Sequence, residues 1–147
     1  MSASYQTKII TLWTVFLLGT LFHTQLGLMP LFHGRSVVVA EAPETGNIAW
    51  VFWLMLGFFV LPLIAMMITL FNDSKRYRRL HFGVTLFYSV LNFFHTVADV
   101  FAKPVAWYQI TLMVVLFIVG LVLNLVAFQW MQERTPGKVL QEHPMSL

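Results

Sequence analysis

The sequence contains no cysteine and few charged residues. Without cysteine the chain can form no disulfide, no thiolate metal site, no iron–sulfur cluster and no covalent c-type haem attachment. Charged residues make up 10% of the 147 residues, whereas a soluble domain carries about 25%. Because so little polar material cannot cover a water-facing surface, the composition excludes an ordinary soluble domain.

Motifs of nucleotide-binding and nucleophilic enzymes are also missing. The sequence has no P-loop, no Gly-x-Gly-x-x-Gly fingerprint and no Gly-x-Ser-x-Gly elbow. The net charge is +3, but four of the nine basic residues lie in one short segment and the other five are scattered along the chain. No nucleic-acid partner is therefore expected, and the sequence leaves open whether the protein is an enzyme.

Long hydrophobic runs dominate the chain instead. The composition is 59% hydrophobic and the mean hydropathy is +0.76. Apolar runs lie at about residues 9–29, 48–71, 81–102 and 105–132, and each meets the roughly 20 residues that a helix needs to cross a bilayer. We therefore predict an all-α integral membrane protein, with a four-helix transmembrane domain at residues 1–134 and a tail at 135–147.

Basic residues are divided unequally between the two predicted sides. The segment 72–80 is the most basic part of the chain, and the positive-inside rule places such a segment in the cytoplasm. With four spans both termini then also lie inside, which makes residues 135–147 a cytoplasmic tail and favours a bacterial inner membrane. The inner side would carry seven basic residues and the outer side two: Lys8, Lys75, Arg76, Arg78, Arg79, Arg134 and Lys138 against Arg35 and Lys103.

The third span carries polar side chains along one face. They recur at steps of three or four residues, which places them on one side of a helix. Hydrocarbon penalises such groups, so this stripe is expected to face the interior of the bundle and to mark a functional site. Its members are His81, Thr85, Tyr88, Asn92, His95, Asp99 and Lys103.

Two histidines are expected at the same depth in the outer half of the membrane. At 1.5 Å per residue, His23 lies about 9 Å and His95 about 10.5 Å below the outer ends of their spans. Residues 20–24 (Thr-Leu-Phe-His-Thr) also match residues 92–96 (Asn-Phe-Phe-His-Thr) at an offset of 72. A parallel two-helix repeat would explain the match, and chance similarity of aromatic-rich segments is the alternative.

The first interpretation of this site is haem b. Neutral imidazoles on facing helices of a bundle commonly hold haem, so His23 and His95 would be its two axial ligands in an electron-transfer protein. Nearby phenylalanines would pack against the haem faces: Phe16, Phe22, Phe93 and Phe94.

The interval of 14 residues between His81 and His95 resembles the histidine spacing in the helices of dihaem cytochrome b. The resemblance covers two residues of one helix and would imply a second haem at His81. The first span, however, has no second histidine near its inner end to pair with His81, so membership of that family does not follow. Beside Arg78 and Arg79, His81 is expected at the membrane interface.

The second interpretation is a non-haem metal site. Imidazole and carboxylate ligands together suit zinc, iron, manganese or copper, and the ion would serve catalysis or transport. The ligands would be His23, His95 and Asp99, with His33 from the outer loop as a further candidate. The polar residues expected to support either kind of site are Asn92, Thr20 and Glu41.

The third interpretation requires no cofactor. Histidine, asparagine and aspartate side chains also hold transmembrane helices together by hydrogen bonds. The protein would then be an anchor or assembly subunit of a larger membrane complex, or would form a homo-oligomer.

Overall fold

A computed structural model of the chain describes residues 3–37, 47–102 and 105–133. Over those residues it contains four helices and no strand. They are α1 (Tyr5–Phe32), α2 (Ala49–Phe71), α3 (Lys75–Phe101) and α4 (Trp107–Gln132). All four are long and apolar enough to cross a membrane. This confirms the predicted all-helical fold and is consistent with a multi-pass membrane protein.

Two helices begin earlier than their hydropathy predicts, because serine side chains cap them. The Ser4 hydroxyl accepts a hydrogen bond from the Thr7 N–H, and the Ser74 hydroxyl accepts one from the Tyr77 N–H. A capping serine satisfies one of the free N–H groups that every helix start leaves. The basic segment predicted as a loop at 72–80 is therefore largely the first turns of α3, and only residues 72–74 connect it to α2.

The first helix also ends later than predicted. The predicted span stopped at about residue 29, before Pro30, but α1 continues to Phe32 with Pro30 inside its last turn. A proline removes one hydrogen bond to the preceding turn, and at the end of a helix that loss does not stop the chain from continuing for two more residues.

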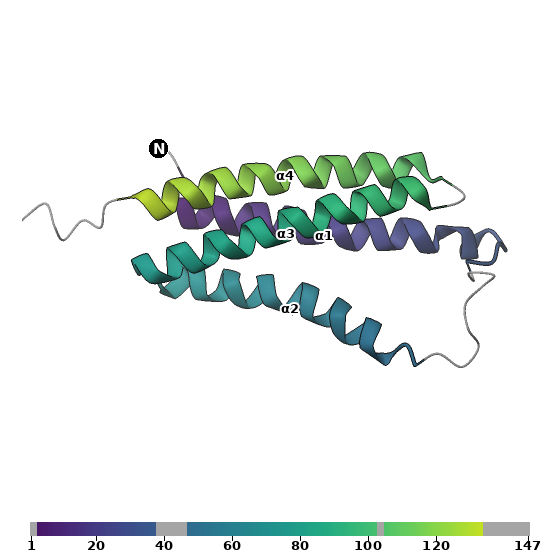
Figure 1. Cartoon of the computed structure of the whole chain (residues 1–147), viewed down its shortest axis with the longest axis horizontal. Helices are drawn as coiled ribbons and strands as arrows, with labels where there is room; N and C mark the ends of the chain where they lie inside the picture. The colour runs from purple at the N-terminus through teal and green to yellow at the C-terminus, as the bar shows by residue number, and fades with distance from the viewer. Residues whose placement is uncertain (1–2, 38–46, 103–104, 134–147) are drawn as a thin grey trace, which may run out of the picture.

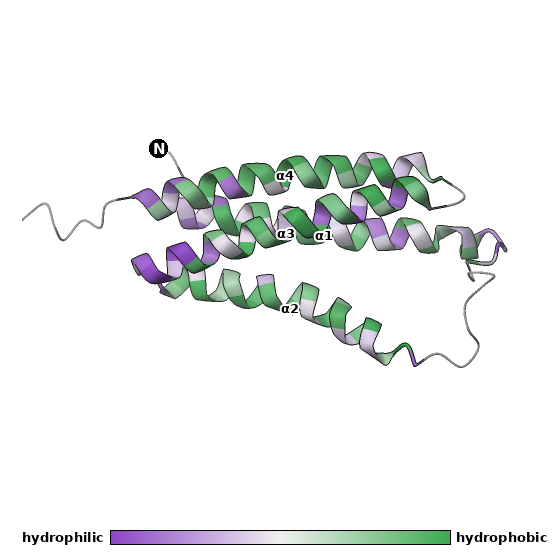
Figure 2. Ribbon diagram, viewed as in Figure 1, coloured by the Kyte–Doolittle hydropathy of each residue, from purple (hydrophilic) through white to green (hydrophobic). Residues whose placement is uncertain are grey.

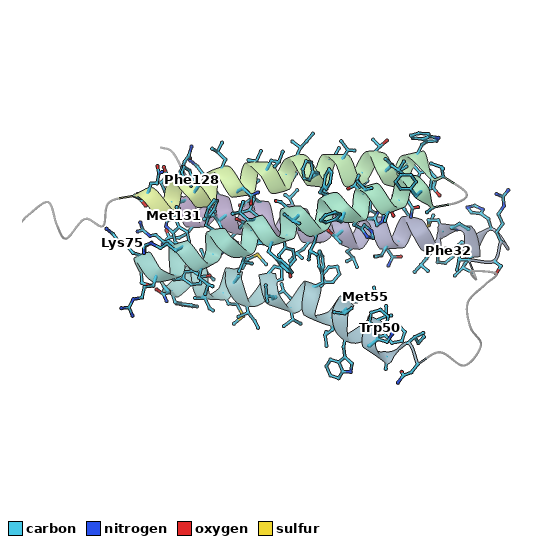
Figure 3. The ribbon with its side chains drawn as sticks, viewed as in Figure 1. Phe32, Trp50, Met55, Lys75, Phe128 and Met131 are labelled. Atoms are coloured by element: carbon cyan, nitrogen blue, oxygen red, sulfur yellow. The ribbon has the colours of Figure 1, made fainter. Side chains whose placement is uncertain are left out.

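The fourth helix packs along both α1 and α3, and α2 contacts α1. Figure 1 shows α2 diverging from the other three helices toward its N-terminal end. Lys75 and Met131 lie at one end of the molecule, and Phe32 and Trp50 lie at the other (Figure 3). Apolar residues cover most of α2 and α4, while the first turns of α3 are strongly hydrophilic (Figure 2).

The N-terminal half of the polar stripe is buried as predicted. His81, Thr85, Tyr88 and Asn92 are all among the buried residues. The Tyr88 ring lies edge-on to Trp13 at 5.1 Å between ring centroids, so aromatic residues of α1 enclose this part of α3. Lys103 lies outside the described residues.

His81 is a core residue of the bundle, a burial that its basic neighbours in sequence did not predict. Its side chain belongs to the core, where it is 1% exposed. The Trp13 Nε1–H donates to His81 Nε2 at 3.2 Å, so the neutral ring carries its proton on Nδ1. That nitrogen lies 3.3 Å from the Tyr77 hydroxyl, which in turn donates to the Ala65 carbonyl at 2.5 Å. Because both ring nitrogens are engaged, His81 has no lone pair left for a haem.

A proline in α2 explains the position of the Tyr88 hydroxyl. Pro62 has no N–H, so the carbonyl of Phe58, one turn earlier, loses its helical partner. The Tyr88 hydroxyl donates to this carbonyl at 2.7 Å. One tyrosine of α3 therefore satisfies the group that the proline leaves free, and ties α2 to the rest of the bundle.

Replacing Tyr88 with phenylalanine is expected to lower the free energy of unfolding by about 0.6–1.7 kcal/mol, the range for hydrogen bonds between membrane helices. The loss should largely vanish in a Pro62→Ala background, because the introduced alanine would supply the missing N–H to the Phe58 carbonyl. A double-mutant cycle in detergent measures this coupling. Equal losses in the two backgrounds would contradict the assignment.

The contact between α3 and α4 uses a small residue and an amide of α4, Gly120 and Asn124. The Asn124 Nδ2 donates to the Ser89 hydroxyl at 2.8 Å. A Cβ at Gly120 would lie 3.1 Å from the same hydroxyl, so glycine allows the close approach of the two helices.

An arginine clamps the start of α3 to the end of α4. Arg78 is 1% exposed and donates to both carboxylate oxygens of Asp73, at 2.9 and 2.7 Å. Its Nη1 also donates to the carbonyls of Trp130 at 3.1 Å and Glu133 at 2.9 Å. These carbonyls lie at the C-terminal end of α4, where the helix leaves backbone acceptors only partly satisfied and a cation is favoured.

Candidate metal centre

Three side chains from α1 and α3 converge in the half of the bundle opposite Arg78. The His23 Nε2 lies 3.4 Å from the His95 Nε2 and 3.5 Å from the Asp99 Oδ2. The His95 Nε2 lies 3.8 Å from the same carboxylate oxygen. Within the part of the chain that the structure describes, this His–His–Asp cluster is the one group of three or more histidines and carboxylates with ligand atoms close together.

The three separations suit ligands of one small ion. In a tetrahedral site with bonds of about 2.0–2.1 Å, neighbouring ligand atoms lie about 3.3–3.4 Å apart. The observed edges of 3.4, 3.5 and 3.8 Å are close to that value. Direct hydrogen bonds of nitrogen to oxygen are usually 2.7–3.2 Å long, so the cluster is looser than a closed hydrogen-bond network would be.

Helical geometry brings these residues together. His95 and Asp99 are one turn apart on α3, which places both side chains on one face. His23 lies on α1 and is buried, while the side chains of Asp99 and His95 are 21% and 55% exposed. The cluster therefore has a closed side at His23 and an accessible side at His95.

Several polar atoms at this level lack a hydrogen-bond partner among the described residues. They are buried and belong to both histidine-bearing helices: His23 Nδ1, Asn92 Oδ1 and Asp99 Oδ2. Buried polar groups are nearly always satisfied in native proteins. Unsatisfied groups gathered at one place indicate that something else, such as an ion, a water molecule or a ligand, completes the site.

A cavity of about 320 Å³ lies beside the cluster. We call it the lateral cavity, and its lining comes mainly from the N-terminal half of α2 and from α1 and α3. Figure 1 shows this half of α2 diverging from the other helices. Its polar wall includes Thr20, Asn92 and His95, and its apolar wall includes Phe58 and Phe59. His95 therefore borders both the cluster and the cavity.

The fourth helix supports the cluster through a residue that sequence reasoning overlooked. The Gln109 Nε2 donates to the backbone carbonyl of His23 at 3.5 Å, and it also lies next to Gly27. Gln109 is a polar residue near the start of the fourth predicted span, and this position was the signal that could have identified it.

The remaining predicted site residues have mixed outcomes. Thr20 lines the lateral cavity, although its hydroxyl donates to the Phe16 carbonyl of its own helix at 2.9 Å. His33 is exposed and lies outside the cluster, because ten residues of helix separate it from His23 by about 15 Å. Glu41 lies outside the described residues.

The phenylalanines expected around a haem are not gathered at the site. Phe22, Phe93 and Phe94 have large exposed fractions and do not line the lateral cavity. Phe16 is buried, but its ring packs on Trp13 and Tyr88, nearer to the N-terminal end of α1 than the cluster is. The aromatic residues of the cavity come instead from α2.

Comparisons with known proteins found no family model, no curated protein and no solved structure that matches this chain.

Proposed function

We propose that this protein is a membrane metalloprotein that holds one transition-metal ion at His23, His95 and Asp99. The observation that carries the proposal is the convergence of two imidazole nitrogens and one carboxylate oxygen within 3.8 Å of one another. Two imidazoles and one carboxylate are a ligand set that Zn²⁺ accepts, and that Fe²⁺ and Mn²⁺ also accept. Three protein ligands leave a fourth position for water or a substrate.

The geometry favours a small ion over haem b. Axial histidines of a haem lie on opposite sides of the iron, about 4 Å apart between nitrogens at bonds of about 2 Å. Here the nitrogens are 3.4 Å apart, and the ring centroids are separated by only 5.3 Å with an interplanar angle of 77°. The Asp99 carboxylate also lies near both nitrogens, in the space that a porphyrin between the rings would need.

The surroundings favour a resident ion over an ion in transit. A transport path would need side chains free to bind the ion between the cluster and the opposite end of the bundle. There the stripe continues as Tyr88, Thr85 and His81. Each of these side chains is buried and already bonded to a protein group. We therefore favour a bound metal with an open position that faces the lateral cavity.

Metal analysis of the detergent-purified protein tests this proposal. We expect one equivalent of Zn²⁺, Fe²⁺ or Mn²⁺ after dialysis against the individual ion, and no Soret absorption. A Soret band would support bis-histidine haem ligation instead. Absence of both metal and haem, even after loading, would support the cofactor-free anchor or assembly subunit.

We also propose the orientation with both termini in the cytoplasm of a bacterial inner membrane. Lys75, Arg76 and Arg79 are exposed on the first turns of α3, at the same end of the molecule as Met131 (Figure 3). A cluster of exposed cations favours the cytoplasmic side. The His–His–Asp cluster would then lie in the outer leaflet.

A phosphatase that is active only outside the cytoplasm tests the orientation. Fused after Arg79 it is expected to be inactive, and fused after Ser36 it is expected to be active, because the two positions lie on opposite sides of the membrane. The reverse pattern would contradict the orientation and would move the cluster to the inner leaflet.

The parallel repeat remains part of the proposal. His23 and His95 are equivalent positions at the offset of 72, and the contact between them supports such a relation. In a symmetric pair of repeats α2 would pack on α3 as α4 packs on α1, but α2 diverges instead (Figure 1). We infer that α2 has moved away from the packing of the ancestral repeat, and that the lateral cavity opens where it moved.

A further inference from the structure

The lateral cavity has one polar end and otherwise apolar walls. Leu54, Met55 and Phe58 form part of the wall contributed by α2, and Asn92 and His95 form the polar end on α3. The cavity is partly open to the outside of the molecule. Leu54 is five residues into α2, about 7.5 Å along the axis from its start. At that depth in a bilayer the opening faces lipid.

Asn92 is the residue that distinguishes this cavity from a packing defect. It is 4% exposed, lines the cavity, and its Oδ1 has no hydrogen-bond partner among the described residues. An unsatisfied buried amide costs free energy that an apolar residue of similar size would not. The amide is therefore positioned to accept a hydrogen bond from a molecule that occupies the cavity.

We propose that the lateral cavity binds an uncharged, lipid-soluble molecule with a hydroxyl head group, which enters from the bilayer between α2 and α3. Its hydroxyl donates to Asn92, and its apolar body packs against Phe58, Phe59 and Met55. This inference goes beyond the metal site and does not require it, because Asn92 is not one of the proposed metal ligands.

The chemistry of the walls selects this class of ligand. The ten lining residues of the cavity include no lysine, arginine, aspartate or glutamate, so a phospholipid phosphate would find no cation there. The hydroxyls of Thr20 and Thr24 donate to carbonyls of their own helix, which leaves their oxygens as acceptors. Acceptors at one end of an apolar cavity match a hydroxyl donor, whether it belongs to a long-chain alcohol or to a quinol.

The test uses a hexadecanol that carries a photoactivatable diazirine in its chain, added to the whole protein in neutral lipid vesicles. A hexadecane with the same diazirine is the matched probe without the hydroxyl. We expect saturable labelling of residues 54–59 and 91–95 by the alcohol and weaker labelling by the hydrocarbon. Competition with unlabelled hexadecanol and with an unlabelled alkyl benzoquinol distinguishes the two sources of the hydroxyl.

Two variants examine the two ends of the cavity. Asn92→Leu should weaken binding of the alcohol about 2- to 10-fold, the range for one hydrogen bond, without affecting the hydrocarbon. Met55→Trp should reduce labelling by both probes, because the larger side chain fills the cavity. Met67→Trp is the matched control, since Met67 is an exposed methionine of the same helix that does not line the cavity.

Folding and metal content are separate controls. Asn92→Leu should unfold at the same temperature as the parent or higher, because the amide oxygen that it removes has no partner among the described residues. Labelling should also persist in protein treated with a chelator, so failure of the metal proposal would not affect this result. Equal labelling by the alcohol and the hydrocarbon, or unchanged alcohol binding in Asn92→Leu, would overturn the proposal.

Discussion

Replacing His23 with alanine is expected to abolish stoichiometric metal binding. His23 is the buried member of the cluster and lies nearest to both other ligands, at 3.4 Å from His95 and 3.5 Å from Asp99. Loss of an outer-shell partner already costs about 10- to 100-fold in metal affinity, and loss of a direct ligand should cost more. Equilibrium dialysis against Zn²⁺, with elemental analysis of the purified protein, measures the effect.

Matched variants separate ligand loss from general damage. His95→Ala should act like His23→Ala, and Asp99→Asn should weaken binding while preserving the volume of the side chain. His33→Ala is the control, because His33 is an exposed histidine outside the cluster. The metal assignment is wrong if His23→Ala and the double variant with His95→Ala retain one equivalent of metal.

Metal binding should also appear in the thermal stability of the parent protein. A ligand that binds only the folded state stabilises it by about 2.7 kcal/mol at a concentration 100 times its dissociation constant. The melting temperature in detergent should therefore rise with added metal in the parent and in His33→Ala, and should not rise in His23→Ala.

Replacing Arg78 with alanine is expected to cause the largest loss of stability in this chain. The substitution would leave the Asp73 carboxylate and the carbonyls of Trp130 and Glu133 without the donor that they share. Removing one partner of a buried ion pair typically costs about 3–5 kcal/mol. Because Asp73 is itself partly exposed, we expect a value toward the lower end of this range, measured as the free energy of unfolding in mixed micelles.

Two substitutions control for charge and for shape. Arg79→Ala removes an exposed arginine one position away and should change stability by less than about 0.5 kcal/mol. Arg78→Lys keeps the charge but lacks the planar fork of donors, so it should restore only part of the lost stability. A similar loss for Arg78→Ala and Arg79→Ala would show that the clamp between α3 and α4 is unimportant.

The polar stripe of α3 has two different environments along its length. In its N-terminal half, His81 and Tyr88 hydrogen-bond to groups of α1 and α2. In its C-terminal half, Asn92 Oδ1 and Asp99 Oδ2 have no hydrogen-bond partner among the described residues and lie near His95. The proposed chemistry therefore belongs to the C-terminal half of the stripe.

Periodicity and depth were sufficient to predict which side chains would converge. His95 and Asp99 share a helix face because they are four residues apart, and His23 matches their depth by arithmetic on helix rise. Hydropathy located the four spans but not their ends, because it ignores the capping serines at Ser4 and Ser74.

Other features depend on tertiary contacts that no local pattern contains. His81 has basic neighbours in sequence, yet Trp13 of α1 and Trp130 of α4 bury it. The lateral cavity exists because α2 diverges from α1 and α3, and an apolar sequence such as that of α2 does not reveal its angle. Because the angle of α2 could not be predicted, the haem interpretation assigned Phe22 and Phe94 to the site. The phenylalanines that line the lateral cavity are instead Phe58 and Phe59.

X-ray absorption spectroscopy at the metal edge of the purified, metal-loaded protein tests the central claim most directly. We predict a first shell of nitrogen and oxygen atoms at about 2.0–2.1 Å, with the outer-shell scattering of two imidazoles, and almost no metal absorption from purified His95→Ala, which should not retain the ion. A shell of oxygen atoms alone, or a spectrum that is the same in the parent and in His95→Ala, would contradict a metal ion held by His23, His95 and Asp99.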